Sequence, residues 1–255
     1  MATIALIGLD SVGASTALSL IRREIQATLL LVDMDTELQD AQVRDLSDAA
    51  LFYESVTKVQ AATHREASQA DVVIITEGMK PTPGEDIYEH VYFKTTVLKS
   101  ILKEMMPINP NTVILVVANP VDLLTTLAQD ITRLPKERVI GVGTCLDTLR
   151  LQEEVSSFLG GTTEETVVCV VGVRDNKSQV VGWPTSRGGD GISNKERLDA
   201  EEDIQGRMKA IVAGEEGTPL EVGAVAASIA VAVLEDKRTV WTVKEFHKVK
   251  EAEGP

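Results

Sequence analysis

The chain has 255 residues, of which 44% are hydrophobic, so it can bury a sizeable core. Its 25 lysine and arginine residues against 39 aspartate and glutamate residues give a formal net charge of −14, which argues against nucleic acid and anionic membranes as partners. No apolar stretch reaches the roughly 18 residues of a membrane span. Cys145 and Cys169 are too few for a disulfide framework or a zinc cluster, and they fit a reducing compartment. Because the first residues lack a secretory signal, we expect a cytoplasmic protein.

The stretch from Thr3 to Asp33 has the pattern of a strand, a glycine turn, a helix and a second strand. Ile4 to Ile7 form a short apolar run with β-branched residues, and apolar residues return at helical spacing over Ala14 to Ile21. The second strand, Leu29 to Val32, ends in Asp33. This pattern predicts half of a doubly wound nucleotide-binding unit, in which the helix N-terminus faces a phosphate and Asp33 faces a ribose, favouring NAD over NADP.

The glycine turn departs from the dinucleotide fingerprint G-x-G-x-x-G at its middle glycine. Gly8 and Gly13 stand at the two ends of the motif, with Val12 before the last glycine, but Asp10 takes the middle position. The middle glycine normally lets the backbone approach a pyrophosphate closely. Two like charges about 4 Å apart repel by roughly 1 kcal/mol in water and about 4 kcal/mol at an intermediate dielectric, so Asp10 should weaken dinucleotide binding by a factor of about 5 to 1000.

Asp10 has a second interpretation that stays open beside the first. Aspartate is a good N-cap, so the Asp10 carboxylate can occupy the anion site of the helix itself. The turn would then be kept for folding while its binding function is degraded.

Apolar strands and helices keep alternating after the second strand. Six apolar strands separated by helices predict an α/β fold with a doubly wound parallel sheet covered on both faces. The further helices are expected at Glu37–Ala50, Ile87–Met106 and Asp122–Thr132, and the further strands at Val56–Gln60, Asp71–Thr76, Asn111–Ala118 and Val139–Val142, with a loop at Glu77–Asp86.

The regular alternation of apolar strands and helices ends near Thr148. We place a dinucleotide-binding domain at residues 1–148 and a smaller α+β substrate domain at residues 149–255. The last helix is alanine-rich and apolar over only about 13 residues, so it should be buried in the protein rather than in a membrane. The predicted elements of this half are a helix at Leu149–Leu159, antiparallel strands at Thr166–Gly172 and Gln179–Trp183, a charged helix at Lys195–Val212 and the small-residue helix at Leu220–Asp236.

With these elements in order, the chain resembles the L-lactate and malate dehydrogenase family over essentially its whole length. The resemblance is carried by the glycine turn, Asp45 and Leu46, Ala118 to Asp122, Leu134 to Leu151, and Glu216 to Val240. It implies a Rossmann fold, NAD as cofactor and a homodimer. Members of the family continue through further strands and a last long helix, so the substrate domain of this chain is expected to be a truncated one.

Four site residues carry over from the resemblance. Asp147 and Arg150 match the aspartate and the carboxylate-binding arginine of the family. Asn119 matches the asparagine that touches substrate and cofactor, and Thr218 matches the threonine of the substrate pocket. The resemblance therefore implies a pocket for a small anionic or carbonyl substrate, and no metal.

The family histidine that exchanges a proton during hydride transfer has no match. Arg174, within the run GVRDN, falls at or within one residue of its position. The mobile loop has also lost the family arginines, whose positions correspond to Pro81 and Ile87. His90 follows this loop and is a candidate replacement base, although an exposed helical histidine is the simpler interpretation.

An arginine cannot act as a general acid or base near neutral pH, because its pKa exceeds about 12. Loss of a positioned acid–base group slows a reaction by roughly 100- to 10,000-fold. Two interpretations of Arg174 stay open: a salt bridge with Asp147, or an oxyanion stabiliser for redox-neutral chemistry. Cys145 is better explained as a small buried thiol than as a nucleophile.

Three functions follow from these residues. In the first, a repurposed enzyme uses Arg150 to hold an anion, Arg174 and Asn119 to stabilise developing charge, and Asp147 to orient Arg174. The second is an atypical NAD-dependent 2-hydroxy acid oxidoreductase in which His90 or water supplies the proton. The third is a catalytically silent binding protein of the same fold.

Overall fold

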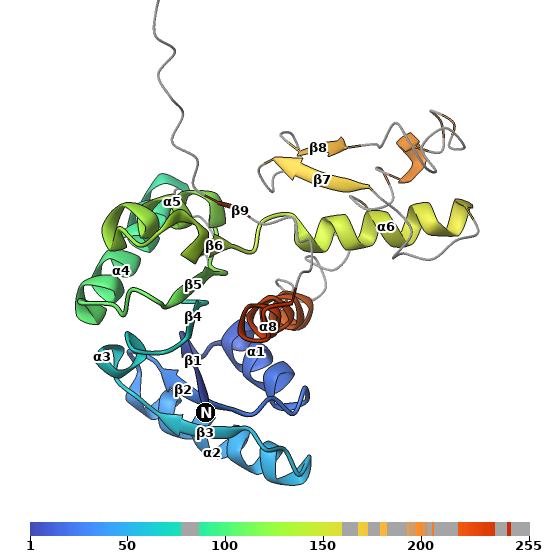
Figure 1. The fold of residues 1–255 in the computed structure, drawn as a ribbon. Helices are drawn as coiled ribbons and strands as arrows, with labels where there is room; N and C mark the ends of the chain where they lie inside the picture. Colours follow the sequence, from blue (N-terminus) through green and yellow to red (C-terminus); the bar gives the residue numbers. More distant parts are fainter. Residues whose placement is uncertain are drawn as a thin grey trace, which may run out of the picture.

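The computed structural model describes residues 1–77, 87–159, 168–172, 179–182, 219–237 and 244–245, together with residues 193, 195, 197–200, 202 and 206. Its main sheet has the strand order β3-β2-β1-β4-β5-β6-β9, and every neighbouring pair is parallel except β6 with β9 (Figure 1). The strands are β1 (Ala2–Ile7), β2 (Ala27–Val32), β3 (Lys58–Ala61), β4 (Val72–Ile75), β5 (Val113–Val116), β6 (Val139–Gly141) and β9 (Lys244–Glu245).

Helices cover both faces of this sheet, which confirms the predicted doubly wound α/β fold (Figure 1). One face packs against α1, α2 and α8, and the other against α3, α4 and α5. Among the described helices, none has the length and apolar character needed to cross a membrane. The helices are α1 (Ser11–Ile21), α2 (Thr36–Phe52), α3 (His64–Ala67), α4 (Ile87–Met105), α5 (Val121–Thr132), the 3-10 turn η1 (Lys136–Arg138), α6 (Cys145–Leu159) and α8 (Pro219–Leu234).

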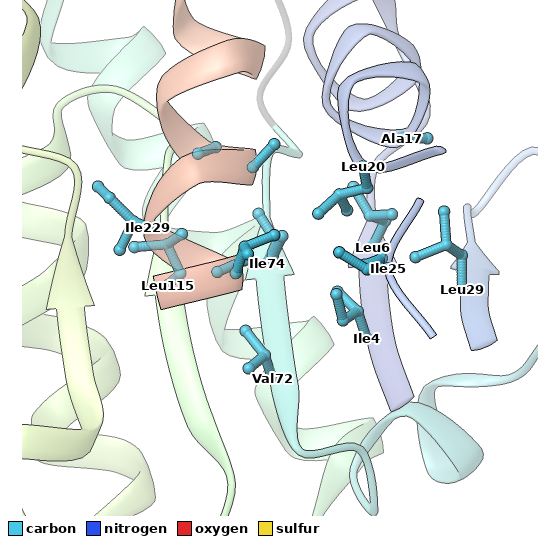
Figure 2. Close-up of a cluster of buried hydrophobic side chains, with 14 of the residues drawn as sticks. Ile4, Leu6, Ala17, Leu20, Ile25, Leu29, Val72, Ile74, Leu115 and Ile229 are labelled. Atoms are coloured by element: carbon cyan, nitrogen blue, oxygen red, sulfur yellow. The ribbon is translucent and has the colours of Figure 1, made fainter. Parts of the chain in front are cut away.

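The alternation of side chains along β1 divides the core between the two faces. Ile4 and Leu6 point to the face covered by α1 and α8, where Figure 2 shows Leu6 beside Leu20, while Ala5 and Ile7 point to the opposite face. All four strand residues are essentially inaccessible to solvent. Because both faces are covered, the central strands are continuous apolar runs, and each large side chain buried there contributes roughly 1.5–3 kcal/mol.

The small-residue helix α8 packs directly against α1. Gly223 makes this approach close, because a Cβ atom at its position would overlap the Ser15 side chain and lie 2.8 Å from the Thr16 backbone nitrogen. The predicted buried helix over residues 220–236 is confirmed with slightly shifted ends. This packing brings the N-terminal end of α8 beside the glycine turn at the start of α1, since the Ser15 hydroxyl donates a hydrogen bond of 3.5 Å to the Leu220 carbonyl.

Helix α6 begins four residues earlier than the sequence pattern predicted. Its first turn is tied to β7 (Cys169–Gly172) by the Thr144 and Thr148 hydroxyls, both hydrogen-bonded to Val170. The helix therefore runs through residue 148, and the division of the chain into two domains stays a prediction. The two predicted antiparallel strands are confirmed as β7 and β8 (Gln179–Gly182), and most of the predicted charged helix over 195–212 lies outside the described residues.

Candidate functional site

The glycine turn joins β1 to α1 at the carboxyl edge of the sheet. Gly8 has a φ of +92°, and a Cβ there would lie 2.6 Å from the backbone nitrogen of Glu77. A Cβ on Gly13 would overlap the Gly8 carbonyl oxygen, to which the buried Thr76 hydroxyl donates a 2.7 Å hydrogen bond. Only glycine permits these two approaches. The turn thus has the compact geometry expected from Gly8 and Gly13.

Asp10 is the N-cap of α1. Its Oδ1 accepts hydrogen bonds from the backbone amides of Val12 at 3.0 Å and Gly13 at 3.3 Å. These are the free N–H groups at the helix N-terminus to which an anion would bind. The predicted capping role is confirmed, and the carboxylate takes the amides that a pyrophosphate would need. The loss of dinucleotide affinity expected from Asp10 stays a prediction.

Asp33 follows β2 and accepts a hydrogen bond that holds the glycine turn next to the end of this strand. Its Oδ2 accepts a 2.7 Å hydrogen bond from the Leu9 amide, and its Oδ1 accepts one of 2.9 Å from the Asp35 amide. Each carboxylate oxygen has a second lone pair, so a ribose hydroxyl can still donate to Asp33. The carboxylate expected to face the ribose is thus held next to the glycine turn.

Glu77 is a third carboxyl group at this turn, where the sequence pattern predicted only the start of a loop. Its Oε2 would lie 2.9 Å from a Cβ built on Gly8. Burial, followed by the charges of Asp33 and Asp10, raises the pKa of Glu77 from 4.5 to about 7. Its position directly after a buried parallel strand was the available signal, because the carboxyl ends of neighbouring parallel strands meet at one edge.

Arg150 lies in a buried ion cluster at the start of α6. Its Nη1 is 3.4 Å from Asp147 Oδ1 on the same helix, and its Nη2 pairs with Glu221 Oε2 in the first turn of α8. The side chains of Arg150 and Asp147 are only 6% and 4% exposed. Glu221 is 71 residues away from Arg150 in the sequence, so no local pattern could predict this contact.

The expected pairing of Asp147 with Arg174 stays a prediction. Arg174 lies outside the described residues, as do Thr218 and Pro81. Within the part of the chain that the structure describes, Asp147 forms an ion pair with Arg150.

Asn119 and His90 come from two further segments. Asn119 is exposed and follows β5, directly before the first turn of α5, at the same edge of the sheet as the glycine turn. His90, expected to be exposed, is instead buried in the first turn of α4. It lies three helical turns before Ile101, on the stripe of α4 that packs against the sheet, which explains its burial.

Cys145 is a buried thiol, as the sequence analysis favoured. Burial, and to a lesser extent the charge of Asp147, raises its pKa to about 12. A thiol with this pKa is not a nucleophile near neutral pH.

The described residues contain a hollow of about 870 Å³, but it lies at the amino edge of the sheet, lined by Ala2, Asp71 and Asn111 among others. It is therefore on the side away from the glycine turn. No group of three histidine, cysteine, aspartate or glutamate side chains in the described ranges is placed to hold a metal ion.

Comparison with known proteins agrees with this geometry. A family model described as the NAD binding domain of lactate/malate dehydrogenase matches residues 2–141. The chain is 34% identical to L-lactate dehydrogenase A of Rhizopus oryzae over 250 residues, covering 95% of this chain and 77% of that protein. It is 33% identical over 180 residues to an L-lactate dehydrogenase of Clostridium perfringens, covering 71% of this chain and 56% of that protein.

Solved structures give the same result. The chain is similar to the minor L-lactate dehydrogenase of Enterococcus mundtii, with a TM-score of 0.88, 25% sequence identity, and coverage of 96% of this chain and 82% of that one. A lactate dehydrogenase from a deep-sea metagenome library has the same fold, with a TM-score of 0.87 at 22% identity over 96% of this chain and 81% of that one.

Proposed function

Because this chain belongs to the lactate/malate dehydrogenase family, we propose that it acts on a small carbonyl- or carboxylate-bearing substrate without the histidine-assisted hydride transfer of that family. The observation that carries the proposal is the capping of α1 by Asp10, whose carboxylate accepts hydrogen bonds from the Val12 and Gly13 amides. A pyrophosphate needs these amides and would meet a carboxylate in their place. The residues at the turn therefore do not fit a tightly bound dinucleotide.

The residues present support electrostatic rather than acid–base catalysis. Arg174 keeps its charge at any accessible pH, so it can stabilise an oxyanion but cannot move a proton. In the proposed arrangement Arg150 holds the anionic group of the substrate, and Asn119 with Arg174 stabilises charge that develops on the carbonyl oxygen. Asp147 positions the arginines, and its buried contact with Arg150 supports this role.

Calorimetric titration with NAD tests the proposal, using the unmodified chain and the variants Asp10→Gly and Asp35→Gly. Asp35 is a matched control because it caps α2 in the same way, through the amides of Glu37 and Leu38. We expect weak binding to the unmodified chain and to Asp35→Gly, and binding about 5- to 1000-fold tighter to Asp10→Gly. Micromolar binding to the unmodified chain, together with oxidation of reduced NAD by 2-oxo acids, would contradict the proposal.

That contradicting result would favour a second candidate, an atypical NAD-dependent 2-hydroxy acid oxidoreductase. Two observations support it: the match to an NAD binding domain, and Asp33, whose carboxylate lies at the turn with lone pairs left for a ribose hydroxyl. Bound NAD would supply the hydride acceptor. In this candidate a water molecule or His90 carries the proton, so turnover should be slower by roughly 100- to 10,000-fold than with a positioned histidine.

A further inference from the structure

The guanidinium that would receive a substrate anion is already neutralised from within the protein. Arg150 contributes one positive charge, while Asp147 and Glu221 contribute two negative charges in contact with it. With all three groups ionised, the cluster has a net charge of −1. A substrate carboxylate that approached Arg150 would therefore meet a guanidinium already paired with two carboxylates.

The carboxylates of Asp147 and Glu221 differ in how easily each can move away from Arg150. Asp147 lies three residues before Arg150 on the same helix and is 4% exposed, so α6 itself holds the two side chains together. The side chain of Glu221 is 24% exposed and comes from the first turn of a different helix, α8. Rotation about its own side-chain bonds can take the Glu221 carboxylate towards solvent without moving α6.

One oxygen of Glu221 is also poorly satisfied in the paired arrangement. Its Oε1 is buried and has no hydrogen-bond partner among the described residues. A buried acceptor without a donor is unfavourable. The paired arrangement with Arg150 therefore has an energetic cost, because one oxygen of the Glu221 carboxylate has no hydrogen bond. An incoming carboxylate that made two hydrogen bonds to the guanidinium fork could replace the single contact made by Glu221.

We propose that Glu221 is an internal competitor for the substrate anion: its carboxylate occupies Arg150 in the free protein and must leave before a substrate carboxylate binds there. This inference rests on the proposed function, in which Arg150 holds the anion. It makes Glu221 a specificity-determining residue, because weakly binding monocarboxylates would not displace it. A ligand with two closely spaced carboxylates, such as oxalate, has the charge to do so.

The test is calorimetric titration of the full chain and of Glu221→Gln with oxalate. The variant keeps the shape of the side chain and removes its charge, so we expect it to bind oxalate about 10- to 100-fold more tightly. Glu235→Gln is the matched control, because Glu235 follows the same helix and pairs with the exposed Lys237 far from Arg150. It should bind oxalate like the unmodified chain.

A second variant shows whether the increase in oxalate affinity depends on Arg150. In Arg150→Lys/Glu221→Gln the positive charge stays but the planar fork is lost, so most of the gained affinity should disappear. If Glu221→Gln does not fold, Glu221→Asp replaces it, because removal of one methylene withdraws the carboxylate from Arg150 and should also tighten oxalate binding. Unchanged oxalate affinity in a folded Glu221 variant would overturn the inference. Oxalate binding needs neither NAD nor turnover, so this failure is separate from that of the proposed function.

Discussion

Glu77 is a carboxyl group whose ionisation opposes folding. Burial raises its pKa to about 7 in the folded protein, against 4.5 for a solvent-exposed glutamate, and the neighbouring Asp33 and Asp10 charges act in the same direction. A raised folded-state pKa gives a stability contribution that is complete below about pH 4.5 and is lost as the pH rises through about 7. This side chain therefore ionises near neutral pH, beside the glycine turn.

The first prediction concerns Glu77→Gln, which cannot ionise. Its melting temperature should equal or fall below that of the unmodified chain near pH 5, and should exceed it above about pH 7, because the variant avoids a buried charge there. Thermal unfolding followed by circular dichroism across this range gives the difference curve. The exposed Glu37→Gln is the control and should follow the unmodified chain. A difference curve without a step between about pH 5 and pH 8 would show that Glu77 is not held in a raised-pKa state.

At the scale of elements, the contact between α1 and α8 connects the glycine turn to the buried ion cluster around Arg150. Gly223 allows the contact because its missing side chain leaves room for Ser15 and for the Thr16 backbone. The contact places the N-terminus of α8, with Glu221, close to the start of α1. A change in helix spacing at Gly223 would therefore disturb the ion pair with Arg150 as well as the core.

Gly223→Ala should destabilise the protein by about 1–3 kcal/mol, because the added methyl group has no space and the two helices must separate. Urea unfolding gives the free-energy difference. Gly206→Ala is the matched control: Gly206 has helical backbone and an added Cβ would meet nothing within 4 Å, so this variant should gain up to about 1 kcal/mol from helix propensity. Equal stability of the two variants would mean that α8 does not pack against α1 as described.

The same elements show what a sequence pattern can predict here. The buried runs around Ile4, Leu29 and Val72 identified central parallel strands, because a strand covered on both faces needs apolar residues at every position. The early start of α6 depends on hydrogen bonds from Thr144 and Thr148 to β7, and β9 has only two residues, so neither left a periodic signal. Asp10 could be predicted as a cap because capping depends only on neighbouring residues. The contact of Glu221 with Arg150 joins residues far apart in the sequence, so it could not be predicted.

For the whole molecule, negative charge gathers at both positions where anions would bind. Asp10, Asp33 and Glu77 surround the glycine turn, and Glu221 with Asp147 neutralises Arg150. These residues lie in or next to five separate strands and helices, α1, β2, β4, α6 and α8, so the pattern belongs to the folded molecule rather than to any motif. It adds to a chain whose net charge is already −14. Asp10 at the turn and Arg174 at the position of the family histidine are separate substitutions, so we expect their effects on dinucleotide binding and on proton transfer to be independent.

The last prediction uses this independence. Asp10→Gly removes the charge at the turn, and Arg174→His supplies a group that can exchange a proton near neutral pH. Reduction of the dicarboxylate oxaloacetate by reduced NAD should be weak with either single variant and should rise by roughly 100-fold or more in Asp10→Gly/Arg174→His, because binding and proton transfer are both needed for turnover. Absorbance of the reduced nicotinamide gives the rate, and Asp35→Gly/Arg174→His controls for the loss of a cap and a charge. If Arg174→His alone is as active as the double variant, Asp10 does not obstruct the dinucleotide, and the second candidate function becomes the better one.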